Sequence, residues 1–147
     1  MKKYLYLFIA ALAFAACDDK DDRHDNDRDY FGTMIVTSLE DPAEAYTWSG
    51  QEFEVEYERN GTITLQLDNV RFKPEMPPLD MDFPGIRYTQ TQSGTALQGD
   101  QIVPRIADRP YQQYLVTELS GTIAGRQLDV EFVCMGYRVV YTGQQTK

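Results

Sequence analysis

The chain has 147 residues, a net charge of −9 and two cysteines. Proteins that bind nucleic acid normally carry a basic stripe for the phosphates; this sequence has none, so we exclude that class. Two cysteines, one of them at position 17 behind an apolar start, do not form a disulfide framework.

The first sixteen residues have the pattern of a bacterial export signal. Two lysines follow Met1, and residues 4–16 are uncharged and almost wholly apolar. Thirteen helical residues span roughly 20 Å, which is less than the roughly 30 Å hydrocarbon core of a bilayer. We therefore predict a cleaved signal over residues 1–16.

Cys17 directly follows two small residues, Ala15 and Ala16. This arrangement resembles the lipobox of bacterial lipoproteins, although Phe14 stands where a lipobox usually has Leu, Val or Ile. The resemblance implies that Cys17 is the site of lipid attachment and that the chain meets the membrane through this lipid. The alternatives are an ordinary secretory signal and an N-terminal anchor helix.

Residues 17–29 are predicted to form a lipidated cysteine and a disordered acidic tether. Residues 18–29 hold seven aspartates, three basic residues and no apolar side chain, so nothing in them can be buried. The only histidine, His24, lies here, and the aspartate spacing lacks the glycine and glutamate of a calcium loop. The acidic run resembles the surface-export signals of Bacteroidota lipoproteins, which implies an outward-facing place on the outer membrane. A periplasm-facing place is the alternative.

Residues 30–147 are long enough for one domain with its own core. The first strand is predicted at Tyr30 to Thr37. Residues 38–51, which include Tyr46 and Trp48, read as an irregular connection.

A hairpin is predicted next, because apolar and polar side chains alternate with period two on both sides of Asn60-Gly61. A three-residue loop, 59–61, keeps the apolar side chains on one face. This register aligns Tyr57 with Ile63, Val55 with Leu65, and Phe53 with Leu67. The opposite face carries Glu52, Glu54, Glu56 and Glu58, which we interpret as a solvated surface rather than a cation site.

Residues 71–84 hold four prolines and read as a long irregular loop. Its apolar side chains, Met76, Leu79, Met81 and Phe83, either cap one end of the fold or belong to a lid over a ligand mouth. Asp80 and Asp82 in this loop are candidates for a calcium or sugar contact.

Short strands are predicted at residues 86–91 and 95–103, followed by a loop containing Pro104 and Pro110. A meander then runs from Tyr114 to Tyr141, with turns at Ala124-Gly125 and Met135-Gly136. Its last two strands align Cys134 with Tyr137, Phe132 with Val139, and Val130 with Tyr141. Cys134 is predicted to be a buried, inert thiol.

These segments predict an all-β fold with eight or nine short antiparallel strands. A closed up-and-down barrel fits that number and removes exposed strand edges. A β-sandwich is the runner-up.

A family resemblance rests on four features of the sequence. They are the lipoprotein start, the strand Tyr30-Phe31-Gly32-Thr33-Met34, the Asn60-Gly61 hairpin and the closing residues 137–143. The chain resembles the calycin-like β-barrel lipoproteins of Bacteroidota over most of residues 30–143. This resemblance implies a barrel interior that can hold a small apolar ligand, and it implies no catalytic residues.

The sequence has no nucleophile elbow, phosphate loop or metal-ligand cluster. We therefore predict no enzyme and no catalytic, metal or cofactor site; a hydrolase built on paired carboxylates is a distant alternative. The first hypothesis is a binding module for a small hydrophobic or amphipathic molecule. Its interior contacts would be Phe53, Val55, Tyr57, Leu65, Phe132 and Tyr141. The second is a filled barrel that acts as a structural or adaptor protein in a surface complex of the outer membrane, with protein partners that the sequence does not identify.

Overall fold

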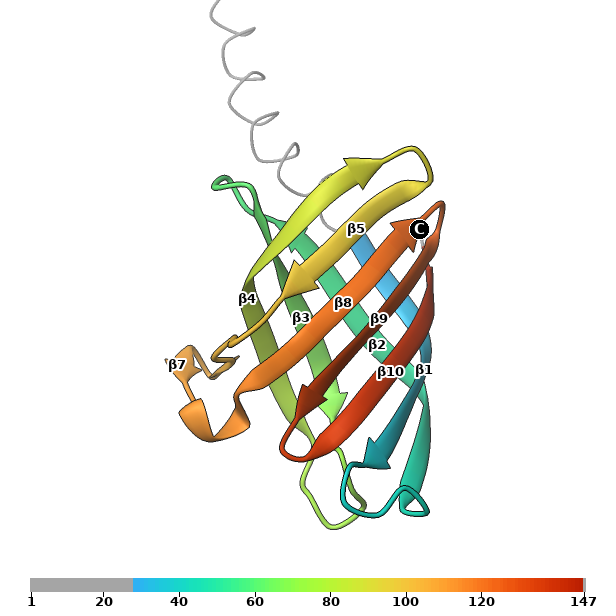
Figure 1. The fold of residues 1–147 in the computed structure, drawn as a ribbon, viewed down its shortest axis with the longest axis vertical. Helices are drawn as coiled ribbons and strands as arrows, with labels where there is room; N and C mark the ends of the chain where they lie inside the picture. The colour runs from blue at the N-terminus through green and yellow to red at the C-terminus, as the bar shows by residue number, and fades with distance from the viewer. Residues whose placement is uncertain (1–27, 147) are drawn as a thin grey trace, which may run out of the picture.

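Eight antiparallel strands close into a barrel in a computed structural model that describes residues 28–146 (Figure 1). The barrel strands are β1 (Arg28–Ser38), β2 (Ala45–Tyr57), β3 (Thr62–Val70), β4 (Leu79–Thr91), β5 (Gly94–Gly99), β8 (Val116–Ala124), β9 (Gln127–Cys134) and β10 (Tyr137–Gln145). Two short strands, β6 (Arg105–Ile106) and β7 (Arg109–Pro110), and a 3-10 turn, η1 (Gln112–Tyr114), lie between β5 and β8.

Each barrel strand pairs with the next barrel strand along the chain, and β1 pairs with β10 to close the ring. Short connections between antiparallel neighbours produce this meander. The prediction of a closed up-and-down barrel is confirmed, and the sandwich is not formed.

Both predicted hairpin registers are confirmed. Tyr57 pairs with Ile63 across β2 and β3, and Cys134 pairs with Tyr137 across β9 and β10. The amide of Glu58 donates to the carbonyl oxygen of Thr62 at 2.8 Å, which leaves the three-residue loop between them. Gly61 has a φ of +85°, the left-handed conformation that such a loop requires.

The connection predicted at residues 38–51 is wrong in its second half, because β2 already begins at Ala45. Gly32 pairs with Gln51 and Met34 with Trp48, so two residues of β2 oppose one residue of β1. This bulge resets the alternation of inward and outward side chains. The period-two pattern therefore breaks at Gly50, where φ is +66°, and the strand before it was missed.

The predicted loop at 71–84 is also too long, since β4 begins at Leu79. Met81 and Phe83, expected in this loop, lie in β4, are fully buried and point into the barrel. Between the pairs Ile63–Ile86 and Leu65–Phe83 the register shifts at Pro84 and Gly85. A bulge of this kind accommodates proline inside a sheet, which is why the prolines misled the prediction.

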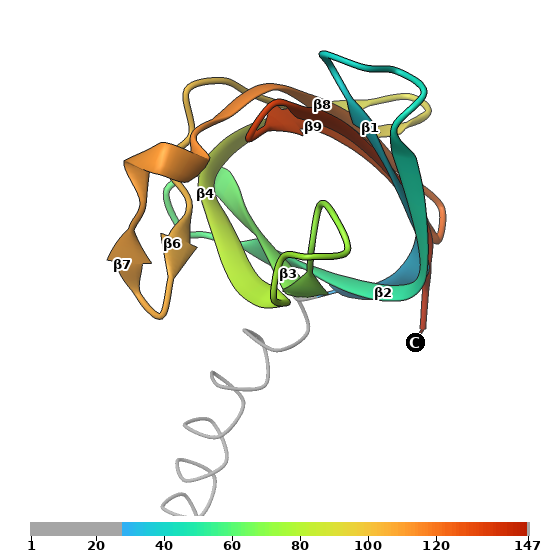
Figure 2. The same cartoon turned by 90° about the horizontal axis from the view of Figure 1, so that it is seen from below.

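The stretch between β5 and β8 forms a small hairpin, β6–β7, where a plain loop was expected. Ala107 and Asp108 at its tip both have positive φ, at 56° and 65°, as a two-residue turn of the primed type requires. Seen from below, this hairpin projects from the barrel wall (Figure 2). The following strand begins at Val116, because Tyr114 belongs to η1.

The core is the inside of the barrel. Its side chains come from every barrel strand and alternate with outward polar side chains. The largest fully buried side chains include Tyr30, Phe53, Phe72, Phe83, Phe132 and Tyr141.

Candidate functional site

The six predicted ligand contacts all point into the barrel, where they pack against other side chains. Phe53, Val55, Leu65, Phe132 and Tyr141 have no accessible surface, and Tyr57 is half-buried at the upper end. An internal space large enough for a water molecule would leave accessible surface on the side chains around it. The middle of the barrel is therefore filled by side chains, which is one of the two outcomes open to an eight-stranded barrel.

Aromatic pairs occupy much of this interior. The rings of Phe53 and Tyr141 are stacked with centroids 3.7 Å apart, and Phe83 meets Phe132 edge to face at 5.0 Å. The hydroxyl of Tyr141 donates to the carbonyl oxygen of Gln51 at 3.0 Å. Burial raises the pKa of Tyr141 above its usual range, so this hydroxyl remains a donor near neutral pH.

Two paired glycines allow close packing where the barrel closes. Gly32 on β1 pairs with Gly143 on β10. A Cβ on Gly143 would overlap the ring of Tyr141, and a Cβ on Gly32 would overlap the carbonyl oxygen of Thr142. The closing strands therefore approach more closely at this pair than two side chains would allow.

The connection between β3 and β4, residues 71–78, caps the lower end of the barrel. Phe72 is fully buried and Met76 nearly so, and the amide of Phe72 donates to Met76 Sδ at 3.4 Å. Figure 2 shows this connection reaching over the opening. Of the four apolar residues predicted to form a cap or a lid, Met76 lies in this connection, whereas Leu79, Met81 and Phe83 belong to β4.

Two buried polar side-chain atoms have no hydrogen-bond partner among the described residues. They are Nε1 of Trp48, a donor, and Oε1 of Gln51, an acceptor. Both side chains come from β2, on either side of its bulge. The guanidinium of Arg71 lies over the Trp48 ring at 5.3 Å, in the range of a cation–π contact.

Cys134, the last residue of β9, is buried, as predicted. Its Sγ donates to the carbonyl oxygen of Tyr114 at 3.3 Å. Burial raises the pKa of the thiol to about 12, so the nucleophilic thiolate is scarce near neutral pH.

We expect Cys134 to resist a disulfide reagent such as DTNB until the barrel unfolds. In a Cys17→Ser chain, which keeps only this thiol, the reaction at pH 8 should be about a hundredfold slower or more than in guanidinium. Equal rates in both solutions would contradict a closed lower end.

Asp80 and Asp82 lie on the outer face of β4, where they join an acidic band with Asp68 of β3. Oδ1 of Asp80 accepts from the amide of Asn69 at 2.9 Å. Asp82 lies opposite Arg105 of β6 in the backbone register of the two strands. Within residues 28–146, no group of three His, Cys, Asp or Glu side chains has the arrangement of a metal site. The calcium or sugar contact predicted for these two aspartates stays a prediction.

The carboxyls of this band repel one another. Partial burial raises the pKa of Asp68, and the nearby carboxyls of Asp80 and Asp29 raise it further. The pKa of Glu52 is raised in the same way, first by partial burial and then by Asp68 and Asp29. A carboxyl whose pKa is higher in the folded chain than in the unfolded chain stabilises the fold below the unfolded pKa. That contribution is lost as the pH rises through the folded pKa.

The Asp68→Asn change is therefore expected to raise the melting temperature at pH 7 by about 1–3 °C. The gain should shrink as the pH falls through the raised pKa of Asp68, because the wild-type carboxyl is then protonated as well. Thermal unfolding followed by circular dichroism measures both values. Glu40→Gln, in an exposed loop, is the control, and a loss of stability in Asp68→Asn would contradict the repulsion.

The outer surface of the described residues carries several open hollows, and two of them concern the faces discussed below. The larger, about 1010 Å³, crosses β4, β5 and β8 and includes Arg87, Gln98 and Glu118 in its lining. The smaller, about 270 Å³, lies over β8, β9 and β10 between Glu131 and Val140. Both are lined by mixed polar and apolar groups.

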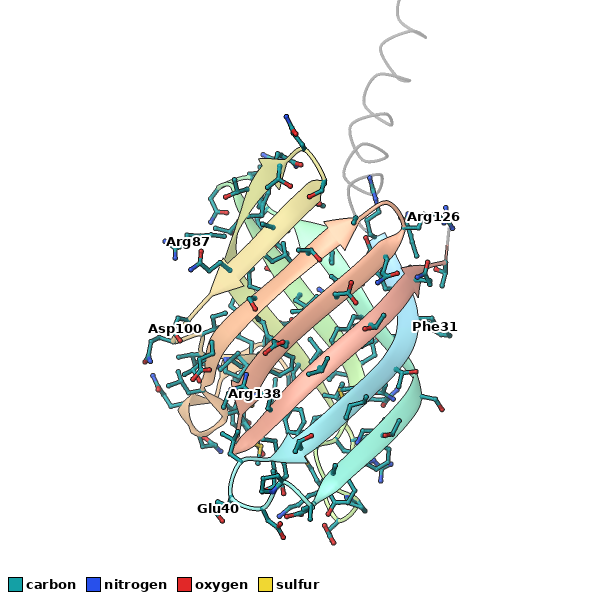
Figure 3. All side chains as sticks on the ribbon, turned by 45° about the vertical axis from the view of Figure 1, so that its right-hand side comes forward. Phe31, Glu40, Arg87, Asp100, Arg126 and Arg138 are labelled. Atoms are coloured by element: carbon teal, nitrogen blue, oxygen red, sulfur yellow. The ribbon has the colours of Figure 1, made fainter. Side chains whose placement is uncertain are left out.

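Five exposed large apolar side chains gather on one side of the outer surface, and the sequence analysis missed them as a group. They are Phe31, Ile35, Leu39, Met135 and Val140, here called the outer stripe. In Figure 3, Phe31 lies at the edge of the barrel opposite Arg87. The available signal was that Phe31 and Ile35 are apolar at positions out of phase with the inward residues Tyr30, Met34 and Val36.

Cys17, the predicted lipid site, lies outside the described residues, as do the signal and most of the tether. In the described part of the chain, no helix has the length and apolar character needed to cross a membrane. The eight-stranded antiparallel barrel is consistent with the calycin-like fold that the resemblance implied. Comparison of the chain with protein-family models, curated proteins and solved structures found no match.

Proposed function

We propose that this chain is a lipid-anchored protein of the cell envelope whose filled barrel acts through its outer surface, as an adaptor within a surface complex. The observation that carries the proposal is the absence of accessible surface on Phe53, Leu65, Phe132 and Tyr141 at the centre of the barrel. A small molecule could enter only if these aromatic contacts were broken. The proposal assigns no catalytic step to the barrel.

The anchor in this proposal is Cys17, with residues 18–27 joining it to the start of β1. The acidic run behind the cysteine supports an outward-facing place on the outer membrane. A tether of this length lets the barrel work some distance from the membrane rather than in it.

We expect the Cys17→Ser change to abolish metabolic labelling with palmitate in the native host. The lipid can form only on a thiol at this position, so the variant should also leave the membrane fraction. Protease added to intact cells should degrade the wild-type barrel if it faces outward. Labelling that persists in Cys17→Ser would refute the anchor, and full protection from protease would refute the outward orientation.

A carrier for a small amphipathic molecule is the second candidate, and the unpartnered atoms of Trp48 and Gln51 favour it. A polar group of a bound molecule can accept from the indole N–H, and a donor of the same molecule can reach the amide oxygen. Native mass spectrometry of the barrel purified from its own host separates the two functions. The adaptor predicts the mass of the polypeptide and its lipid alone, whereas a stoichiometric extra mass lost in Trp48→Phe would favour the carrier.

A further inference from the structure

We propose that the outer stripe is a docking surface for a cationic amphipathic helix of a partner protein. This inference rests on the proposed function, since it names the kind of partner that the outer surface would hold. It follows from the position of the stripe, the charges beside it and the pairing of the strands beneath it.

The outer stripe runs along β1 and β10. Ile35 on β1 pairs directly with Val140 on β10, and the amide of Leu39 donates to the carbonyl oxygen of Gly136, next to Met135. Phe31 lies four residues before Ile35 on the same outward face. The five side chains are between 40% and 50% exposed, and the chain places its large exposed apolar groups nowhere else in the described residues.

The stripe is also neutral over most of its length. Thr33 pairs with Thr142, and Phe31 pairs with Gln144, so no charge interrupts its upper two thirds. From Phe31 to Leu39 the strand rises about 26 Å. A helix of about 18 residues has the same length.

Carboxylates flank the stripe on both sides. On β2, Glu52 pairs with Phe31. On β9, Glu131 pairs with Val140 and Asp129 with Thr142. Arg138 lies within the lower part of the stripe, opposite Thr37, and is held by Glu118 and Glu131 at 3.2 and 3.1 Å. The 270 Å³ hollow beside Val140 is lined by Asp129 and Glu131, which suits the end of a lysine or arginine side chain.

The charges select the occupant. A second copy of this chain would bring carboxylates against carboxylates, and an anionic surface would be repelled by both flanks. A segment with apolar side chains along its middle and lysine or arginine at its sides is complementary to this arrangement.

The strand pairing selects a helix. β1 pairs with β2 and β10, and β10 pairs with β1 and β9. Their backbone groups are therefore used within the barrel, and a partner cannot add a strand. It has to lie on the side chains, and an amphipathic helix presents one apolar face to such a surface.

The test uses a chain that begins at residue 18, because the barrel closes and fills its core within residues 28–146. The probe is an 18-residue peptide with leucine at helical spacing and lysine elsewhere, and its control has glutamate in place of lysine. Binding is followed by ¹⁵N chemical shifts and by titration at two salt concentrations. We expect shifts confined to β1, β10 and the adjoining part of β9, and no binding of the glutamate peptide.

Two pairs of variants separate the apolar and the charged contributions. The double variant Phe31→Ser, Val140→Thr should weaken binding of the lysine peptide at least about tenfold. Its control, Thr89→Ala with Gln98→Ala on the opposite side of the barrel, should not weaken binding.

The double variant Glu52→Gln, Glu131→Gln should weaken binding and reduce its salt dependence. Glu75→Gln with Asp108→Asn changes the net charge equally but lies away from the stripe, so it should have little effect.

Binding that survives the Phe31→Ser and Val140→Thr changes would overturn the proposal. A dimer in sedimentation that those changes abolish would also overturn it, because the occupant would then be a second copy. Flotation with phosphatidylcholine vesicles that those changes abolish would do the same, because the occupant would then be a bilayer. None of these outcomes bears on the palmitate label or on the filling of the barrel. A failed stripe therefore leaves the proposed anchor and adaptor to stand or fall on their own tests.

Discussion

Replacing Phe132 with alanine is expected to lower the free energy of unfolding by about 3–5 kcal/mol. The ring is fully buried and meets Phe83 edge to face at 5.0 Å, so the change removes both its burial and its partner contact. Domains of this size are stable by about 5–15 kcal/mol, which makes the loss a large fraction of the total. Urea unfolding followed by the fluorescence of Trp48, the single tryptophan, measures it.

The matched control is Val140→Ala, which removes an apolar side chain from the outer stripe. Because Val140 is already 40% exposed, its loss should change the unfolding free energy by about 0.5 kcal/mol or less. A Phe132→Ala chain as stable as this control would show that the interior is not closely packed.

The Gly32→Ala change is expected to destabilise the barrel by about 3 kcal/mol, the upper end of the cost of overpacking. The added Cβ would overlap the carbonyl oxygen of Thr142, which belongs to the backbone of β10 and cannot rotate away. Relief requires the closing strands to separate, which weakens their hydrogen bonds and displaces the Tyr141 ring. Thermal and urea unfolding of the variant measure the effect.

Thr33→Ala, one residue later on the outer face, is the control and should leave stability nearly unchanged. If Gly32→Ala unfolded at the same urea concentration as this control, the close approach of β1 and β10 at Gly32 and Gly143 would be refuted.

Strands with uninterrupted alternation could be predicted from the sequence down to their register. In the hairpin around Asn60-Gly61, one shift of pairing would move the apolar residues to the wet face, so Tyr57 could only align with Ile63. The same constraint fixed Cys134 opposite Tyr137. Closure of the ring followed from the number of strands and the cost of exposed edges.

Strands that contain bulges could not be predicted from period-two alternation. At Gly50, and at Pro84 and Gly85, an extra residue shifts the inward set by one position, so the strands on either side no longer share one period. Trp48 and Phe83 were therefore assigned to loops although both belong to strands. Prediction of these bulges needs the partner strand, because only the pairing shows that two residues oppose one.

Neither the filling of the interior nor the outer stripe could be predicted from the sequence. Phe53 and Tyr141 could be placed inside the barrel, but whether they line a cavity or fill it depends on ring orientations that the period-two pattern does not carry. The outer stripe depends on side chains from β1, β10 and the turn before it. Its members are far apart in the sequence and meet only when the barrel closes.

The central claim is that the barrel is filled and leaves its outer surface as the functional part. Xenon binding, measured in pressurised crystals of the barrel, tests it most directly, because an apolar cavity of roughly 150 Å³ takes up xenon. We predict no xenon inside the wild-type barrel and a new interior site in Phe132→Ala, which serves as the positive control. Xenon bound inside the wild-type barrel would contradict the claim.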